Sequence, residues 1–206
     1  MLIKINEKVR SYTSKLLRRF NGDNRGAAAV EFAIIAPLLI SMYLGTMEIS
    51  RGLQVNKKVG RSASSVADLI AQIDGGALDK ATIESIMKIG KATLQPYNLT
   101  QPTIIATGVN INAVGAATVS WSRQLANTTP STPYAAGSAV TNIPAKLLIA
   151  NTFLIKVQTK LEYRSVTSWS LGKNKTDANG TYAAIDMSEV YYLRPRTVST
   201  LSCNDC

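Results

Sequence analysis

The feature that most constrains this chain is an apolar run from Ala27 to Met47 that contains a single charged residue, Glu31. The run has about the length, roughly 20 residues, that an α-helix needs to cross the hydrocarbon core of a bilayer. A charge in that core costs about 2.5–3.5 kcal/mol on insertion scales, and less near its boundary, so an acidic residue there usually has a partner or a task. We therefore expect a membrane helix in which Glu31 has a function.

A secretory signal peptide is the main alternative, because it also has basic residues followed by an apolar run. The run here is longer than a usual signal core of about 7–15 residues, and no small-residue site of the A-x-A type closes it. These differences favour a helix that is retained in the mature protein.

The net charge of +10 could indicate a nucleic-acid-binding protein, but the basic residues are unevenly distributed. A weaker basic cluster, Arg51, Lys57, Lys58 and Arg61, follows the apolar run. The stronger cluster precedes it and consists of Lys4, Lys8, Arg10, Lys15, Arg18, Arg19 and Arg25. An excess of Lys and Arg on one flank marks the cytoplasmic side of a membrane helix. We expect a cytoplasmic N-terminus and no nucleic-acid partner.

The boundary between the basic segment and the apolar run reads Arg25-Gly26-Ala27-Ala28-Ala29-Val30-Glu31-Phe32. This boundary resembles that of type IV pilin-like precursors, in which a dedicated prepilin peptidase cuts after a glycine that ends a basic leader. The resemblance places the cut between Gly26 and Ala27. It also makes Glu31 the fifth mature residue, followed by Phe32, and implies that these two residues act in assembly.

Within that group, the chain most resembles the TadE-like minor pilins or pseudopilins of tight-adherence (Flp) pilus systems. The Ala-rich Glu-Phe-Ala start between Gly26 and Pro37 carries this resemblance, together with the tail Tyr191–Arg196. The resemblance implies the inner membrane, other pilin-like subunits, pilus assembly proteins and the prepilin peptidase as partners. The alternative for the tail is an ordinary terminal strand that Pro195 ends and whose arginines are solvated.

Beyond Met47 the apolar residues continue at helical spacing to Ile73, and Asp74-Gly75-Gly76 should end this long helix. A second helix is expected over Ala77–Leu94, before Pro96. Its apolar positions are Leu78, Ile83, Ile86, Ile89 and Leu94.

From Leu99 onward the spacing changes to two, and β-branched and aromatic residues become common, which predicts strands. A hairpin connection is expected at Val114–Ala116, a surface loop at Asn127–Pro144 and a polar turn at Leu171–Gly180. The expected strands are Thr103–Asn112, Ala117–Leu125, Leu147–Ser168 and Thr181–Leu193. The predicted fold is therefore α+β, with a long membrane-spanning helix, a second helix and an antiparallel sheet of about four strands.

Catalysis has little support, because the chain lacks histidine, the commonest general base and metal ligand. Asp186-Met187-Ser188-Glu189 approaches the Asp-x-Ser-x-Ser metal pattern, but Val190 stands where the last serine would be, and we interpret it as an ordinary strand. We expect no catalytic residue, no metal, no cofactor and no small-molecule substrate.

Cys203 and Cys206 are the two cysteines of the chain, and a zinc site would need two further ligands that no other Cys or His can supply. In an oxidising periplasm the pair would favour a disulfide. So short a loop adds little entropic stability, so the bond would tie the tail or exchange with a partner.

The resemblance, taken with these observations, implies a non-enzymatic assembly component of a tight-adherence pilus or secretion system, anchored by a single pass in the bacterial inner membrane. The expected parts are a basic leader (1–26), the membrane helix (27–47), a periplasmic helical region (48–96) and a periplasmic sheet domain (97–206). Two alternatives stay open. One is an unprocessed, membrane-anchored periplasmic binding module, and the other is a periplasmic enzyme with a Ser/Lys- or Cys-based site.

Overall fold

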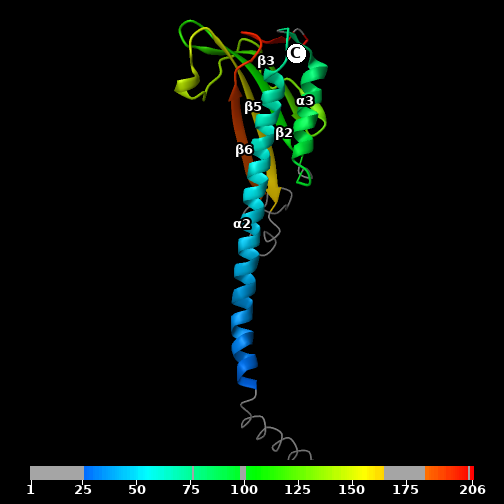
Figure 1. Cartoon of the computed structure of the whole chain (residues 1–206), viewed down its shortest axis with the longest axis vertical. Helices are drawn as coiled ribbons and strands as arrows, with labels where there is room; N and C mark the ends of the chain where they lie inside the picture. The colour runs from blue at the N-terminus through cyan, green and yellow to red at the C-terminus, as the bar shows by residue number, and fades with distance from the viewer. Residues whose placement is uncertain (1–25, 76, 98–100, 165–183, 204) are drawn as a thin grey trace, which may run out of the picture. The chain divides into compact units, whose positions relative to one another are not determined.

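A computed structural model describes residues 26–75, 77–97, 101–164, 184–203 and 205–206 (Figure 1). The basic leader before Gly26 and the polar turn expected at Leu171–Gly180 lie outside these residues. The chain divides between Met47 and Glu48 into an N-terminal unit and a C-terminal unit. Helix α2, Ala27–Ala71, begins in the first unit and ends in the second.

The C-terminal unit is built on a five-stranded antiparallel sheet with the strand order β4-β3-β2-β5-β6. The hairpin between β2 and β3 turns at Gly115, whose φ of 80° suits a residue without a Cβ. The strands are β2 (Thr103–Ile111), β3 (Ala117–Ala126), β4 (Thr129–Ser131), β5 (Thr152–Arg164) and β6 (Ala184–Leu193). The expected α+β class, with a long apolar helix, a second helix and an antiparallel sheet, is confirmed.

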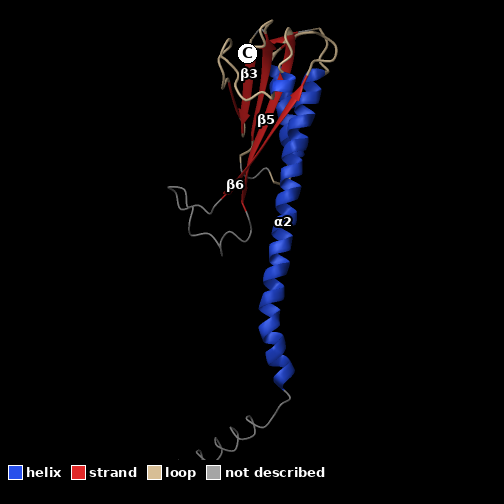
Figure 2. Cartoon of the chain, turned by 90° about the vertical axis from the view of Figure 1, so that its left-hand side faces the viewer, coloured by secondary structure: helices blue, strands red, loops and turns tan. Residues whose placement is uncertain are grey.

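Two helices cover one face of this sheet, which we call the helix side (Figure 2). These are the Glu48–Ala71 part of α2 and the second helix α3, Lys80–Thr93. The largest buried cluster joins both helices to alternate residues of the central strands, including Ile104, Trp121 and Ile155. Burial of this apolar surface is the main source of stability for the unit.

The opposite face, which we call the loop side, holds a smaller cluster of Val109, Ile111, Ala117 and Leu154. The connection between β4 and β5 packs against it and contains the short 3₁₀ helix η2, Ala145–Leu147. The register of β3 against β2 shifts at Gly108/Val109, which is a β-bulge. Because the bulge reverses the alternation, Ala117 joins the loop-side cluster whereas Trp121 joins the helix-side cluster.

The second helix begins later than expected, because Ala77–Leu78 form strand β1 and not a first helical turn. β1 pairs in parallel with β7, Ser202–Cys203, so its hydrogen-bonding partner lies far away in the sequence. Ile89 is 53% exposed and does not belong to the apolar face predicted for α3. The buried positions are Ile83, Ile86, Met87 and Gly90, a stripe from which Ile89 is rotated away.

Two further boundaries differ from the predictions. The expected loop Asn127–Pro144 contains β4, which pairs with the end of β3. The strand expected from Leu147 begins at Thr152, after η2, and its predicted end at Ser168 lies outside the described residues. The sheet therefore has a short edge strand, β4, that was not predicted because its residues are polar and include Pro130.

Candidate functional sites

The N-terminal unit places the predicted cleavage and assembly residues at the start of α2. Gly26 directly precedes the helix, and Ala27 is its first residue. Glu31 lies four positions after Ala27, so both residues are on the same face, one turn apart. Within the described part of the chain, Glu31 forms no ion pair.

The surface of this helical segment is apolar on every side. Exposed fractions are 67% for Phe32, 70% for Ile34, 61% for Leu38 and 66% for Tyr43. A helix that is apolar all round needs a lipid or protein environment. Among the described residues, α2 is the one helix long and apolar enough to cross a membrane.

Two hydroxyl groups of the segment donate hydrogen bonds within the helix. Ser41 Oγ donates to Leu38 O at 2.8 Å, and Thr46 Oγ1 donates to Tyr43 O at 2.9 Å. Pro37 lies inside the helix and has no N–H to donate to Ala33 O. A helix surrounded by hydrocarbon has no water to bind its hydroxyl groups, so hydrogen bonds to its own carbonyls are favourable there.

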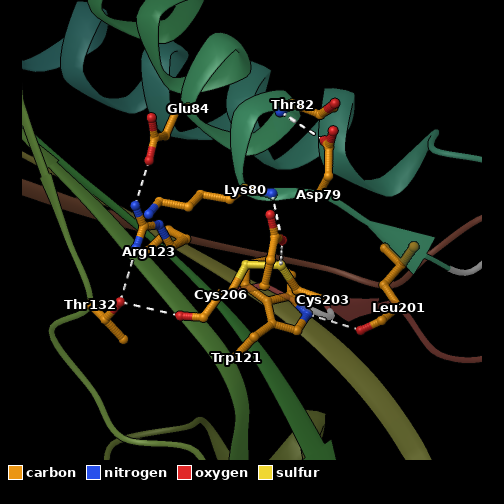
Figure 3. The surroundings of a disulfide bond; sticks show 11 residues. Asp79, Lys80, Thr82, Glu84, Trp121, Arg123, Thr132, Leu201, Cys203 and Cys206 are labelled. Atoms are coloured by element: carbon orange, nitrogen blue, oxygen red, sulfur yellow. Dashed lines mark hydrogen bonds and ion pairs between the residues drawn. A yellow bond between two sulfur atoms is a disulfide. The ribbon is translucent and has the colours of Figure 1, made fainter.

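The second candidate site is the C-terminal segment, in which Cys203 and Cys206 are joined by a disulfide (Figure 3). Leu201 is fully buried in the main cluster, and its carbonyl accepts a 2.9 Å hydrogen bond from Trp121 Nε1. The segment is therefore anchored in the core immediately before the disulfide-closed loop. Cys203, Asp205 and Cys206 lie close enough to hold a metal, but sulfurs in a disulfide are not thiolate ligands.

The disulfide-closed loop contacts the start of α3. Asp205 Oδ1 accepts a 2.9 Å hydrogen bond from Lys80 N, and Asp79 Oδ1 accepts one of 2.9 Å from Thr82 N. Hydrogen bonds from the side chain and the backbone of Thr82 hold the pKa of Asp79 below its usual value. The tail thus supplies a second carboxylate to a helix start that already has an N-cap, where negative charge is favourable.

A buried ion pair lies next to this loop. Arg123 Nη2 pairs with Glu84 on α3, and their side chains are only 6% and 18% exposed. Arg123 Nη1 donates to Thr132 Oγ1 at 3.0 Å, and Thr132 Oγ1 donates to Cys206 O at 3.3 Å (Figure 3). One network therefore joins β3, α3 and the tail.

Arg196, from the predicted tail motif Tyr191–Arg196, contacts the end of α2. β6 ends at Leu193, before Pro195, as predicted for a terminal strand. The Arg196 N–H donates to Ala71 O at 2.9 Å, and its guanidinium pairs with Asp68. Arg196 is therefore an intramolecular partner of α2, which neither interpretation of the motif predicted.

Asp186 and Glu189, from the incomplete metal pattern, lie in β6 with alternating directions. Met187 packs against the helix-side cluster of Val55, Val59 and Leu161. Trp121, Arg123 and Asp205 were not predicted from the sequence as parts of a site. Two features of the sequence could have indicated them. Arg123 occupies an inward position of a strand with alternating apolar residues, and Asp205 lies between Cys203 and Cys206.

Comparison with known families gives one match. The model of the family described as TadE-like protein matches residues 26–68, which confirms the resemblance found in the sequence. The matched stretch contains Gly26, Ala27, Glu31 and most of α2. No curated protein and no solved structure matches the chain. The match covers 43 of the 206 residues.

Proposed function

We propose that this TadE-like chain is a pseudopilin of a tight-adherence pilus or related secretion system, anchored in the inner membrane by residues 27–47. The observation that carries the proposal is the family match, which begins at Gly26 and covers the glycine, the carboxylate and the apolar helix together. The exposure of apolar side chains around that helix supports burial in lipid or among other pilin helices.

The proposed mechanism is structural. The prepilin peptidase cuts after Gly26 and creates a charged amine on Ala27. Glu31 of one subunit then neutralises that amine on a neighbouring subunit, and Phe32 packs in the same contact. The low dielectric constant of the membrane strengthens this ion pair. A single pair of the Ala27 amine with the Glu31 carboxylate therefore fixes the axial register of neighbouring helices.

The proposed orientation places the N-terminal leader in the cytoplasm and the C-terminal unit in the periplasm. The basic flank before Ala27 supports this orientation by the positive-inside rule. The Cys203–Cys206 disulfide supports it too, because disulfides persist in oxidising compartments.

The test compares variants at the two positions. Gly26→Val should keep the leader attached, because a branched side chain obstructs the peptidase cleft even though the chain's own fold leaves space for a Cβ there. Glu31→Gln should insert in the membrane and lose its leader, but should not assemble. Mass spectrometry of the mature N-terminus and electron microscopy of pili give the readouts.

Phe32→Leu is the matched control, because it keeps an apolar residue beside Glu31 and should retain processing. Normal pili with Glu31→Gln would rule out the pairing role. A wild-type membrane form that begins at Met1 would reject the precursor mechanism and favour the unprocessed binding module.

A further inference from the structure

The loop side of the sheet carries a pocket of about 370 Å³ that the proposed membrane function does not use. Its floor is formed by Thr107, Lys156 and Gln158, and its walls by the 134–142 loop and Tyr192. Thr107 pairs with Lys156 in the β2–β5 register, and Lys156 pairs with Tyr192 in the β5–β6 register. The three side chains therefore form one row across three strands.

Lys156 is the positive charge of this pocket. It is partly buried, and the loss of water around it lowers the pKa of its ammonium group. In the described part of the chain no carboxylate forms an ion pair with it. Because burial makes an unpaired charge more costly, a negatively charged group beside Lys156 would be favourable.

A second hollow continues from this pocket along the same two strands. It has a volume of about 420 Å³ and is lined by Lys160, Glu162, Asp186 and Ser188, among other residues. Gln158 lines both hollows, so they adjoin. From residue 156 to residue 162, β5 advances by roughly 20 Å, the reach of an extended segment of about six residues.

The charges along this path differ between its ends. Lys156 is the charged residue that lines the first hollow, whereas Lys160, Glu162 and Asp186 line the second, where carboxylates outnumber lysines by one. A polyacidic chain would meet repulsion at the second end. The path instead matches a segment with one carboxylate, placed over Lys156, and uncharged or basic residues beyond it.

We propose that the loop side binds an extended segment of a partner protein whose single Asp or Glu side chain enters the 370 Å³ pocket and pairs with Lys156. Thr107 and Gln158 line the same pocket, but the Thr107 hydroxyl bonds to Ser122 Oγ at 3.2 Å and the Gln158 amide donates to Ser188 Oγ at 3.0 Å. Lys156 is therefore the group that pairs with the carboxylate. The inference deepens the proposed function, on which it rests for the expectation that the partner is another component of the assembly.

The test uses the full chain in detergent and a fluorescent, capped hexapeptide of Ser, Val and Thr with one central Glu. Fluorescence anisotropy at low salt should show saturable binding, and the matching Gln peptide should bind at least 10-fold more weakly. Lys156→Met should weaken the Glu peptide by a similar factor. Lys146→Met removes a lysine outside both hollows and should leave binding unchanged.

Equal binding of the Glu and Gln peptides would overturn the proposal, as would an absence of saturable binding to the wild-type chain. Free N-acetylglutamate that binds as tightly as the peptide would reduce the pocket to a small-anion site and would also reject a peptide path. Circular dichroism melts should show that Lys156→Met folds. Leader removal is measured separately, so a failure of the precursor mechanism is distinguishable from a failure here.

Discussion

Tyr163 Oη donates a hydrogen bond of 2.6 Å to Glu48 Oε1 and so joins β5 to α2 across 115 residues of sequence. Tyr163 belongs to the buried cluster of Val55, Val59, Leu94 and Leu161. Burial, followed by the hydrogen bond to Glu48, raises the pKa of Tyr163 to about 12. The folded state therefore favours the neutral phenol.

This bond predicts a pH dependence at the alkaline end. An unfolded tyrosine ionises near pH 10, whereas folded Tyr163 ionises near pH 12. The contribution of Tyr163 to the free energy of unfolding is fully present below about pH 10. It is lost as the pH rises to about 12, because the tyrosine of the unfolded state releases its proton at a lower pH than the folded one. Ultraviolet titration of the full chain should show a tyrosine with this high pKa, and Tyr163→Phe should remove it. A Tyr163→Phe difference spectrum that titrates near pH 10 would contradict the assignment.

Glycines at two helix positions should respond oppositely to alanine. A Cβ on Gly90 would lie under 3.0 Å from Val66 Cγ2, where α3 crosses α2, so Gly90→Ala should destabilise by about 1–3 kcal/mol. A Cβ on Gly60 would meet Glu189 Cγ at 3.9 Å, an ordinary contact. Gly60→Ala should therefore stabilise by up to about 1 kcal/mol through helix propensity. Chemical denaturation measures both, and equal effects would contradict the close helix crossing.

The buried and exposed ion pairs should differ in strength. Glu84→Gln leaves the buried guanidinium of Arg123 without its counter-ion and should cost about 3 kcal/mol or more. Asp68→Asn breaks the pair with Arg196, whose side chain is 60% exposed, and should cost less than about 1 kcal/mol. Urea denaturation of each variant gives the comparison. A small loss for Glu84→Gln would show that water reaches Arg123.

Reduction of the Cys203–Cys206 disulfide should loosen the tail locally. The closed loop is so short that its loss should cost at most about 2 kcal/mol in unfolding free energy. Asp205 would then hold Lys80 N less firmly, so hydrogen exchange at the Lys80 amide should accelerate. The indole N–H of Trp121 should stay protected, because Leu201 remains in the core. Unchanged exchange at Lys80 would show that the disulfide does not hold this cap.

The parts of the fold that could be predicted are those that local pattern determines. The alternation of apolar residues located β2 and β3 almost to the residue, and the long apolar run located α2. The parts that were missed depend on distant partners. Ala77–Leu78 continue a helical pattern and become a strand only because Ser202–Cys203 pair with them.

The same reason explains the contacts that the sequence did not reveal. Trp121 binds the carbonyl of Leu201, 80 residues away, and Arg196 binds Asp68, 128 residues away. Each residue alone has an ordinary type for its position. Only the fold brings the members of each pair together, so spacing rules could not identify them.

The anchoring of Leu201 in the core has a consequence for how the chain matures. A ribosome makes residues 196–206 after every helix and strand that they contact, so the C-terminal unit lacks a core side chain and the partner of β1 until they emerge. Until then the preceding segments should stay incompletely packed. Chains truncated before Leu201 should therefore be recognised by proteases as unfinished.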